Sequence, residues 1–250
     1  IGPDLSLVIR GDYVVSDATL NRFFSFHVIA VPLVLIGLVV AHIIALHEVG
    51  SNNPDGIEIK KKKNAAGIPL DGIPFHPYYS VKDIVGVVGF LFFFSAVVFF
   101  APEGGGYFLE FNNFIPADPL KTPPHIAPVW YFTPFYSILR AVTYPLFGLD
   151  AKFWGVVAMG ASVVIIAFLP WLDRSPVKSI RYKGGIFKGA LVIFLICFFI
   201  LGYLGVLPPT PGRTLVAQIC SVLYFAFFLL MPWYSKIDKC KPEPERVNFK

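Results

Sequence analysis

Residues 26–47 read "FHVIAVPLVLIGLVVAHIIALH", an apolar stretch whose only ionisable residues are three histidines. A helix that crosses a bilayer core needs about 20 mostly apolar residues. Four more blocks share this character, so the predicted spans are residues 22–47, 84–101, 153–171, 189–207 and 214–233. The pattern predicts an all-α integral membrane bundle of about five transmembrane helices.

The composition agrees with a membrane protein. Only 15% of the 250 residues are charged and 56% are hydrophobic, whereas soluble domains carry about 25% charged residues. Cys197, Cys220 and Cys240 form no CxxC pair. We therefore expect the two cysteines inside apolar blocks, Cys197 and Cys220, to behave as small buried hydrophobes, with no disulfide and no cysteine-bound metal in the chain.

The basic residues indicate how the chain is oriented. The segments 47–83, 172–188 and 234–250 alternate with the spans on one side and hold 15 of the 21 Lys and Arg residues. By the positive-inside rule this side is cytoplasmic. Residues 1–21 and 102–152 then lie on the opposite side, and the net charge of +5 reflects topology. No nucleic-acid partner is expected.

The loop at 102–152 is too apolar and too rich in Pro and aromatic residues for a plain tether. Residues 134–144 have helical character between proline-rich turns, so we expect a structured extramembrane loop with short helices. Long loops with structure of their own are commonly functional.

His27 and His42 are 15 residues apart, about 22 Å along an α-helix, which places one imidazole near each face of a bilayer core. The two side chains are turned roughly 60° from each other, and Pro32 predicts a distortion that could align them. Two stacked b-type haems require such a pair. Spacing alone favours two core histidines hydrogen-bonded to neighbouring helices, and one zinc ion cannot bind both.

Five motifs decide between these interpretations: "TLNRFFSFH", "LHEVGSNNP", "FHPYYSVKD", "TPPHIAPVWYF" and "SVLYFAFFLLMPWY". Together, and in this order, they resemble cytochrome b of the quinol–cytochrome c reductase (bc1) complex, from residue 1 to about residue 235. The chain resembles the C-terminal portion of that protein, from the end of the loop before its fourth transmembrane helix onward.

The resemblance implies that two b haems bind this chain. His27 looks like an axial ligand of the low-potential haem on the positive side, and His42 like a ligand of the high-potential haem on the negative side. The second axial ligand of each haem would come from a missing N-terminal part. Many family members place these histidines 14 residues apart, so the extra residue near Ala30–Pro32 should form a local bulge.

The resemblance also implies a quinone-reducing site on the negative side. His47, Ser51 and Asp83 occupy its motif positions. Quinone reduction consumes two protons, so a His and a carboxylate that relay them fit the chemistry. Asp83 at a helix start would have its anion favoured by the helix dipole. Phe75 offers a ring face to the quinone, and Lys82 delivers protons or holds an anionic lipid. The alternative is that His47 and Asp83 only cap helices.

The quinol-oxidising site of the family is expected around "PVWY" at 128–131. The family usually has Glu as a proton acceptor where this chain has Val129. The proton exit must therefore differ, through Tyr131, Tyr136, water or another carboxylate. Glu110, Asp118 and His125 are nearby in sequence. Pro128, Val129, Trp130 and Phe132 are expected to shape and contact the site, unless the loop is only an interfacial aromatic belt.

The implied function is electron transfer from quinol through two haems to quinone, with proton translocation, in a bacterial inner membrane. The implied partners are the Rieske iron–sulfur protein, cytochrome c1, a second cytochrome b and membrane lipids. A transporter or channel is the first alternative, but spans 84–101 and 189–207 are almost wholly apolar. The second is a structural half of a split b6f-type complex, although that subunit lacks a histidine-bearing helix.

Overall fold

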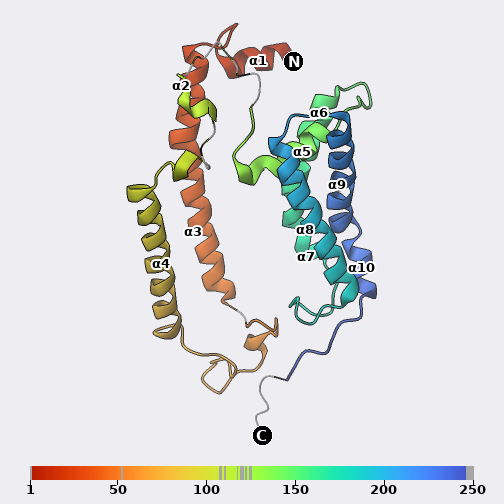
Figure 1. Ribbon diagram of the computed structural model, residues 1–250. Helices are drawn as coiled ribbons and strands as arrows, with labels where there is room; N and C mark the ends of the chain where they lie inside the picture. The colour runs from red at the N-terminus through yellow and green to blue at the C-terminus, as the bar shows by residue number, and fades with distance from the viewer. Residues whose placement is uncertain are drawn as a thin grey trace. The chain divides into compact units, whose positions relative to one another are not determined.

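The computed structural model describes residues 2–51, 53–106, 109, 111–116, 118, 121, 123 and 126–245. The chain forms two compact units (Figure 1). The first unit comprises residues 1–52 and 74–124, and the second comprises residues 53–73 and 125–250. The loop at 53–73 therefore packs with the second unit, although it connects two helices of the first.

Helices of the first unit follow the order of the chain. Its α-helices are α1 (Gly2–Arg10), α2 (Asp17–Ser25), α3 (Val31–Val49) and α4 (Tyr78–Phe100), and its shorter turns are η1 (Phe26–Ala30), η3 (Gly104–Gly106) and η4 (Phe111–Phe114). Ser16 is the N-cap of α2, and its N–H donates to Oγ1 of Thr19 at 3.3 Å. A Ser at the N-cap with a Thr three residues later is a common start for a helix.

A π-helical turn, η1, joins α2 to α3 without a break. Val31 donates its N–H to the carbonyl oxygen of Phe26, five residues earlier. Pro32 has no N–H for the carbonyl of Val28, and its ring crowds that carbonyl in a regular α-helix. The wider turn just before Pro32 accommodates the ring, so the predicted local bulge is confirmed.

The second unit contains the remaining helices. They are η2 (Ile59–Lys61), η5 (Trp130–Phe132), α5 (Thr133–Ala141), α6 (Ala151–Val164), η6 (Ile165–Phe168), α7 (Leu169–Leu172), α8 (Gly185–Val206), α9 (Pro211–Leu229) and α10 (Met231–Ile237). Helix α5 lies in the loop predicted to be structured. It packs against α6, α8 and α9.

Five helices of the described chain are long and apolar enough to cross a membrane: Asp17–Val49, Tyr78–Phe100, Ala151–Leu172, Gly185–Val206 and Pro211–Leu229. No strand occurs among the described residues. The predicted fold class is confirmed. Four boundaries differ clearly from the prediction: the first span begins at Asp17, α4 at Tyr78 and α8 at Gly185, and α9 ends at Leu229. Pro232 explains the end of α9, because proline opens a new helix more easily than it continues one.

The core of the second unit lies between α5, α8 and α9. Ile138, Leu201, Tyr224 and Phe228 are almost fully buried there. Tyr224 also donates its hydroxyl to the carbonyl of Ser162 at 2.8 Å, so its polar end is satisfied inside the bundle. Cys197 and Cys220 are buried in the same core, as small hydrophobes are.

A buried ion pair closes one end of the second unit. The Lys183 ammonium bonds Asp173 and lies 3.6 Å from the centre of the Phe187 ring. Burial raises the pKa of the Asp173 carboxyl, but hydrogen bonds from Lys183 and Ser175 outweigh it and lower the pKa below its usual value. The Asp238 side chain accepts hydrogen bonds from the N–H groups of Gly184 and Ile186. It therefore satisfies two backbone donors at the start of α8.

Candidate functional site

His27 and His42 lie on one continuous helix. His27 is inside the π turn η1, and His42 is in the second half of α3. Because the π turn contains one more residue than an α turn, the 15 steps advance the helix about as far as 14 α-helical steps. The two side chains then point about 40° apart around the helix axis, compared with about 60° in the opposite sense for 15 regular α-helical steps. The bulge therefore gives a 15-residue spacing the phase of a 14-residue spacing.

Both imidazole rings are free for a ligand. His27 and His42 are exposed in the described chain, and neither makes a hydrogen bond or ion pair with any residue that the structure describes. An imidazole in a hydrocarbon environment needs a partner for its nitrogens. The residues present therefore fit one axial haem ligand near each end of the helix, and the described chain holds no cluster of three or more metal-binding side chains.

The quinone-site candidates occupy one end of the first unit. His47 lies in the last turn of α3, where the helix dipole favours a cationic ring. Ser51 follows Gly50, which has a φ of 73° and ends the helix. Helices α3 and α4 run in opposite directions (Figure 1). The C-terminal end of α3 and the N-terminal end of α4 therefore share a side of the first unit.

At the start of α4 the candidates form an aromatic and cationic row. The ring of Phe75 stacks on Tyr79 with centroids 5.7 Å apart, and the Lys82 ammonium lies 5.8 Å from the Tyr79 ring. Asp83 is exposed on the same helix. No hydrogen bond or ion pair joins Asp83 to His47 among the residues described.

The expected position of Asp83 at a helix start is wrong. Helix α4 begins at Tyr78, so Asp83 is its sixth residue, and the first turn contains no acidic residue. The stabilising effect of the helix dipole falls off within that first turn. Asp83 therefore gains little from the dipole, and neither His47 nor Asp83 caps a helix, since Pro77 and Gly50 occupy the caps.

The "PVWY" segment directly precedes α5 in the second unit. Pro128 is half-buried, whereas Val129, Trp130, Tyr131 and Phe132 are exposed in this chain. The three aromatic residues form η5, with the Trp130 and Tyr131 rings edge to face at 5.4 Å. Four side chains from this segment, Val129 and the three aromatic residues, therefore present an uncovered, mostly aromatic surface. Val129 offers no group that can accept a proton.

Tyr136 lies one turn further along, half-buried on α5. The Arg140 guanidinium carbon is 4.6 Å from the centre of its ring, a cation–π contact. Arg140 in turn donates to the carbonyls of Leu204 at 2.6 Å and Leu207 at 3.0 Å, at the C-terminal end of α8. The ring of Tyr136 is thus held by a side chain that is itself fixed to a membrane-spanning helix.

Close packing fixes the rest of α5. Ser137 donates to the carbonyl of Leu201 at 2.5 Å. Gly205 lies directly against the backbone of Thr133, and a Cβ atom at Gly205 would collide with the Thr133 carbonyl. The quinol-site candidates therefore sit on a rigid support. Glu110 and His125 lie outside the described residues, and Asp118 is exposed.

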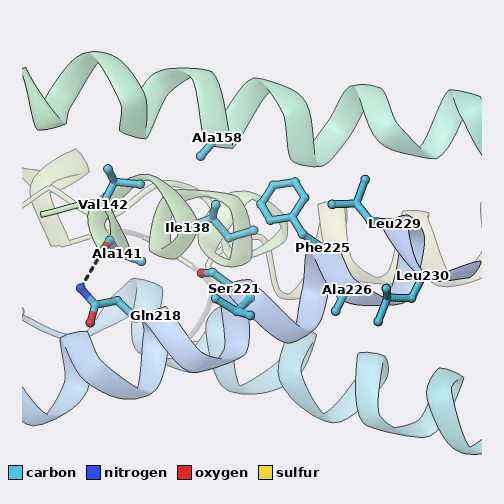
Figure 2. A pocket seen from close by; sticks show the side chains of 11 residues that line it. Ile138, Ala141, Val142, Ala158, Gln218, Ser221, Phe225, Ala226, Leu229 and Leu230 are labelled. Carbon is cyan, nitrogen blue, oxygen red and sulfur yellow. Dashed lines mark hydrogen bonds between the residues drawn. The ribbon is translucent and has the colours of Figure 1, made fainter. Parts of the chain in front are cut away.

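An apolar cavity of about 530 Å³ lies on another face of α5, between α6 and α9. Figure 2 shows Phe225 and Ile138 facing it and the Gln218 amide bonded to the Ala141 carbonyl at 3.0 Å. Its lining carries no ionisable group. Proton chemistry therefore has no acceptor there.

Two family models match the chain. The model described as "Cytochrome b(N-terminal)/b6/petB" matches residues 1–134, and the model described as "Cytochrome b(C-terminal)/b6/petD" matches residues 116–225. The chain belongs to the cytochrome b family. The predicted family resemblance is confirmed.

Known members of the cytochrome b family match almost the whole chain. Cytochrome b of Allochromatium vinosum is 61% identical over 252 residues, which cover 99% of this chain and 60% of the relative. Cytochrome b of Rhodospirillum rubrum is 42% identical and is covered to 57%. A solved structure described as "Hyperthermophilic respiratory Complex III" has a TM-score of 0.76 and 40% identity, with 93% of this chain and 56% of that chain covered. The chain spans about 60% of the length of the curated relatives that it matches.

Sequence reasoning missed Arg140 as a neighbour of the candidate residue Tyr136. A usable signal was present, since Arg140 follows Tyr136 by four residues and such pairs meet on a helix face. Its bonds to Leu204 and Leu207 join residues more than 60 positions apart. Such contacts leave no local pattern in the sequence.

Proposed function

We propose that the chain is the membrane-embedded electron-transfer subunit of a quinol–cytochrome c reductase of the bc1 type. The observation that carries the proposal is the single helix with two unpartnered histidines, one toward each end, in phase through a π turn. Membership of the cytochrome b family supports it. In this function electrons pass from quinol across the membrane to quinone, and protons are released on one side and taken up on the other.

His27 and His42 would each hold one b haem by an axial nitrogen. Haem b supplies the capacity to accept and release single electrons. His27 belongs to the low-potential haem on the positive side and His42 to the high-potential haem on the negative side. The chain has five histidines, and His47, His76 and His125 lie at or beyond the ends of the spans. The second axial ligands would therefore come from outside this chain.

The quinone-reducing site would use the end of the first unit that carries His47 and Asp83. Both side chains are exposed and able to relay protons from the cytoplasmic side. Ser51 would hydrogen-bond the quinone, and Phe75 would offer it a ring face. Lys82 would deliver protons to Asp83 or hold an anionic lipid.

The quinol-oxidising site would form around Pro128, Val129, Trp130 and Phe132, which shape and contact the ring. With valine at position 129, the phenol of Tyr131 or Tyr136 is the group that accepts or passes on the proton. The contact between Arg140 and Tyr136 supports Tyr136, because the cation–π contact holds the Tyr136 ring in a defined position.

The segments 1–21 and 102–152 would face the positive side, and 48–83 and 234–250 the negative side. Within a whole cytochrome b the chain would correspond to the part from the end of the loop before the fourth transmembrane helix onward. The partners would be the Rieske iron–sulfur protein, cytochrome c1 and a second cytochrome b, in a bacterial inner membrane with its lipids.

The proposal is tested by a reduced-minus-oxidised difference spectrum of the complex that contains this chain. Two b-type haem signals with different midpoint potentials are expected, because the two imidazoles occupy different depths. A spectrum without b-type bands would refute the electron-transfer function and favour transport.

A further inference from the structure

The loop at 53–73 is folded and belongs to the second unit. The Asn53 side chain accepts from the N–H groups of Asp55 and Ile57, each at 3.1 Å, and donates to the Ile57 carbonyl at 3.0 Å. Asn64 closes a second turn in the same way, through the N–H groups of Ala66 and Ile68. The loop therefore has a defined shape and is no loose connection.

One buried carboxylate fastens this loop to the segment between α7 and α8. Asp55 is only 7% exposed. One of its oxygens accepts the Tyr182 hydroxyl at 2.7 Å and an Arg181 nitrogen at 3.3 Å. These contacts join residues more than 120 positions apart in the chain. We call this group of three the loop clasp.

The clasp needs a specific backbone around it. Gly56 has a φ of +76° and lies against the Cβ of Lys178 and the N–H of Ser179, where a side chain would collide. Because the backbone at Gly56 approaches Lys178 and Ser179 so closely, the Asp55 carboxylate lies within hydrogen-bonding distance of the Tyr182 hydroxyl. A buried carboxylate is costly unless it is paired and hydrogen-bonded. The bond to Asp55 also raises the pKa of the Tyr182 phenol, so the phenol keeps its donor proton at neutral pH.

A second contact between the same segments is weak. Lys178 and Glu58 approach to 4.0 Å, and the Lys178 side chain is 69% exposed. Exposed ion pairs of this kind contribute little. Among these contacts, Asp55 makes the buried link between the two segments, and Glu58 is its natural control.

The ends of the clasped loop are the proposed quinone residues. Ser51 precedes Asp55 by four residues and Phe75 follows the loop by two. Four residues reach at most about 14 Å, so a fixed Asp55 restricts the chain at Ser51. We propose that Asp55, with Arg181 and Tyr182, is a positioning group for quinone reduction. This inference rests on the function proposed above: the clasp would hold the chain around Ser51 in the geometry that binds quinone.

The test uses the whole complex, with Asp55→Ala, Asp55→Asn and Tyr182→Phe compared with Glu58→Gln. Loss of the clasp should raise KM for quinone reduction, because disorder near Ser51 must be removed at each binding event. We expect KM to rise about tenfold in Asp55→Ala, with smaller rises in Asp55→Asn, which keeps an acceptor oxygen, and in Tyr182→Phe. Glu58→Gln should change nothing.

The readouts separate the clasp from the function itself. Quinol oxidation and both b-haem bands should stay normal in every variant, because no clasp residue touches either proposed haem ligand. An unchanged quinone KM in Asp55→Ala and Tyr182→Phe, with normal haem bands, would overturn the clasp. Equal slowing of both half-reactions would also overturn it, since that indicates a general loss of structure. Absence of haem bands in the unaltered complex would instead overturn the proposed function.

Discussion

Helices α3 and α8 are both long and strongly apolar, yet they have opposite surroundings in this chain. No residue of α3 is buried, whereas α8 buries Phe187, Cys197, Leu201 and Gly205. Helix α8 packs with α5 and α9 around a shared core, and α4 resembles α3 in burying nothing. High hydropathy thus predicts that a helix enters the membrane, but it does not predict which neighbouring helices pack against it.

The polar groups of the two regions differ in the same way. In the second unit, the side chains of Ser137, Gln218 and Tyr224 donate hydrogen bonds to carbonyl groups of helices in the same unit. The imidazoles of His27 in η1 and His42 in α3 have no such partner in the described chain. These three side chains of the second unit find partners inside that unit, whereas the two imidazoles need a partner from outside the described chain.

The largest expected effect removes one of those groups. His42→Leu should abolish the high-potential haem signal and leave the low-potential signal largely intact, because an axial ligand is lost from one site only. Redox titration of the two b-type bands measures this. His76→Leu is the control, since His76 lies outside the spans and both signals should survive. Retention of both signals in His42→Leu would refute the ligand assignment.

A second change breaks the packed unit instead. Gly205→Ala should destabilise it by about 2–3 kcal/mol, because the new methyl group collides with the Thr133 carbonyl. Gly202→Ala is the matched control: its Cβ would meet nothing closer than 3.5 Å, so it should be neutral or slightly stabilising. Thermal unfolding of the purified complex in detergent compares the two. Similar melting temperatures for both would contradict the close contact.

Asp83→Asn sharpens the comparison at the exposed end of the first unit. We expect quinone reduction to slow about tenfold while quinol oxidation slows less, because a proton relay is lost at one site only. Separate assays of the two half-reactions measure the ratio. Equal slowing would argue against Asp83 at the quinone-reducing site.

The smallest expected effect comes from Val129→Glu. A carboxylate next to Trp130 adds a proton acceptor that the unaltered chain lacks, so the pH dependence of quinol oxidation should change. Val129→Gln has a similar size but does not titrate, and its profile should match that of the parent. If the Glu and Gln variants have the same profile, position 129 lies off the proton path.

Much of this arrangement follows from local sequence patterns. The runs of apolar residues predicted five spans, and Pro32, with a histidine spacing one residue longer than in many family members, predicted the bulge that became η1. Each signal acts within a few residues of its effect. The orientation of the chain in the membrane stays a prediction from the distribution of Lys and Arg.

Other features could not be predicted from local patterns, because they depend on contacts between residues far apart in the sequence or on helical residues that lie outside the apolar runs. Helix α4 begins six residues before its predicted start, since Tyr78–Asp83 are polar or aromatic but still helical. Asp55 reads as an ordinary turn residue, and only the fold places Tyr182 and Arg181 upon it. The contact of Arg140 with the end of α8 has the same origin.

The wide turn before Pro32 also bears on how this helix tolerates insertions and deletions. The π turn at Phe26–Ala30 contains one more residue than an α turn, and the regular α-helix continues from Val31. If this residue is deleted, the π turn can become an ordinary α turn. Every side chain beyond the turn then keeps its direction around the helix axis. If His27 and His42 hold haem as proposed, these two positions must therefore preserve their direction around the helix axis, whereas the number of residues between them can vary by one.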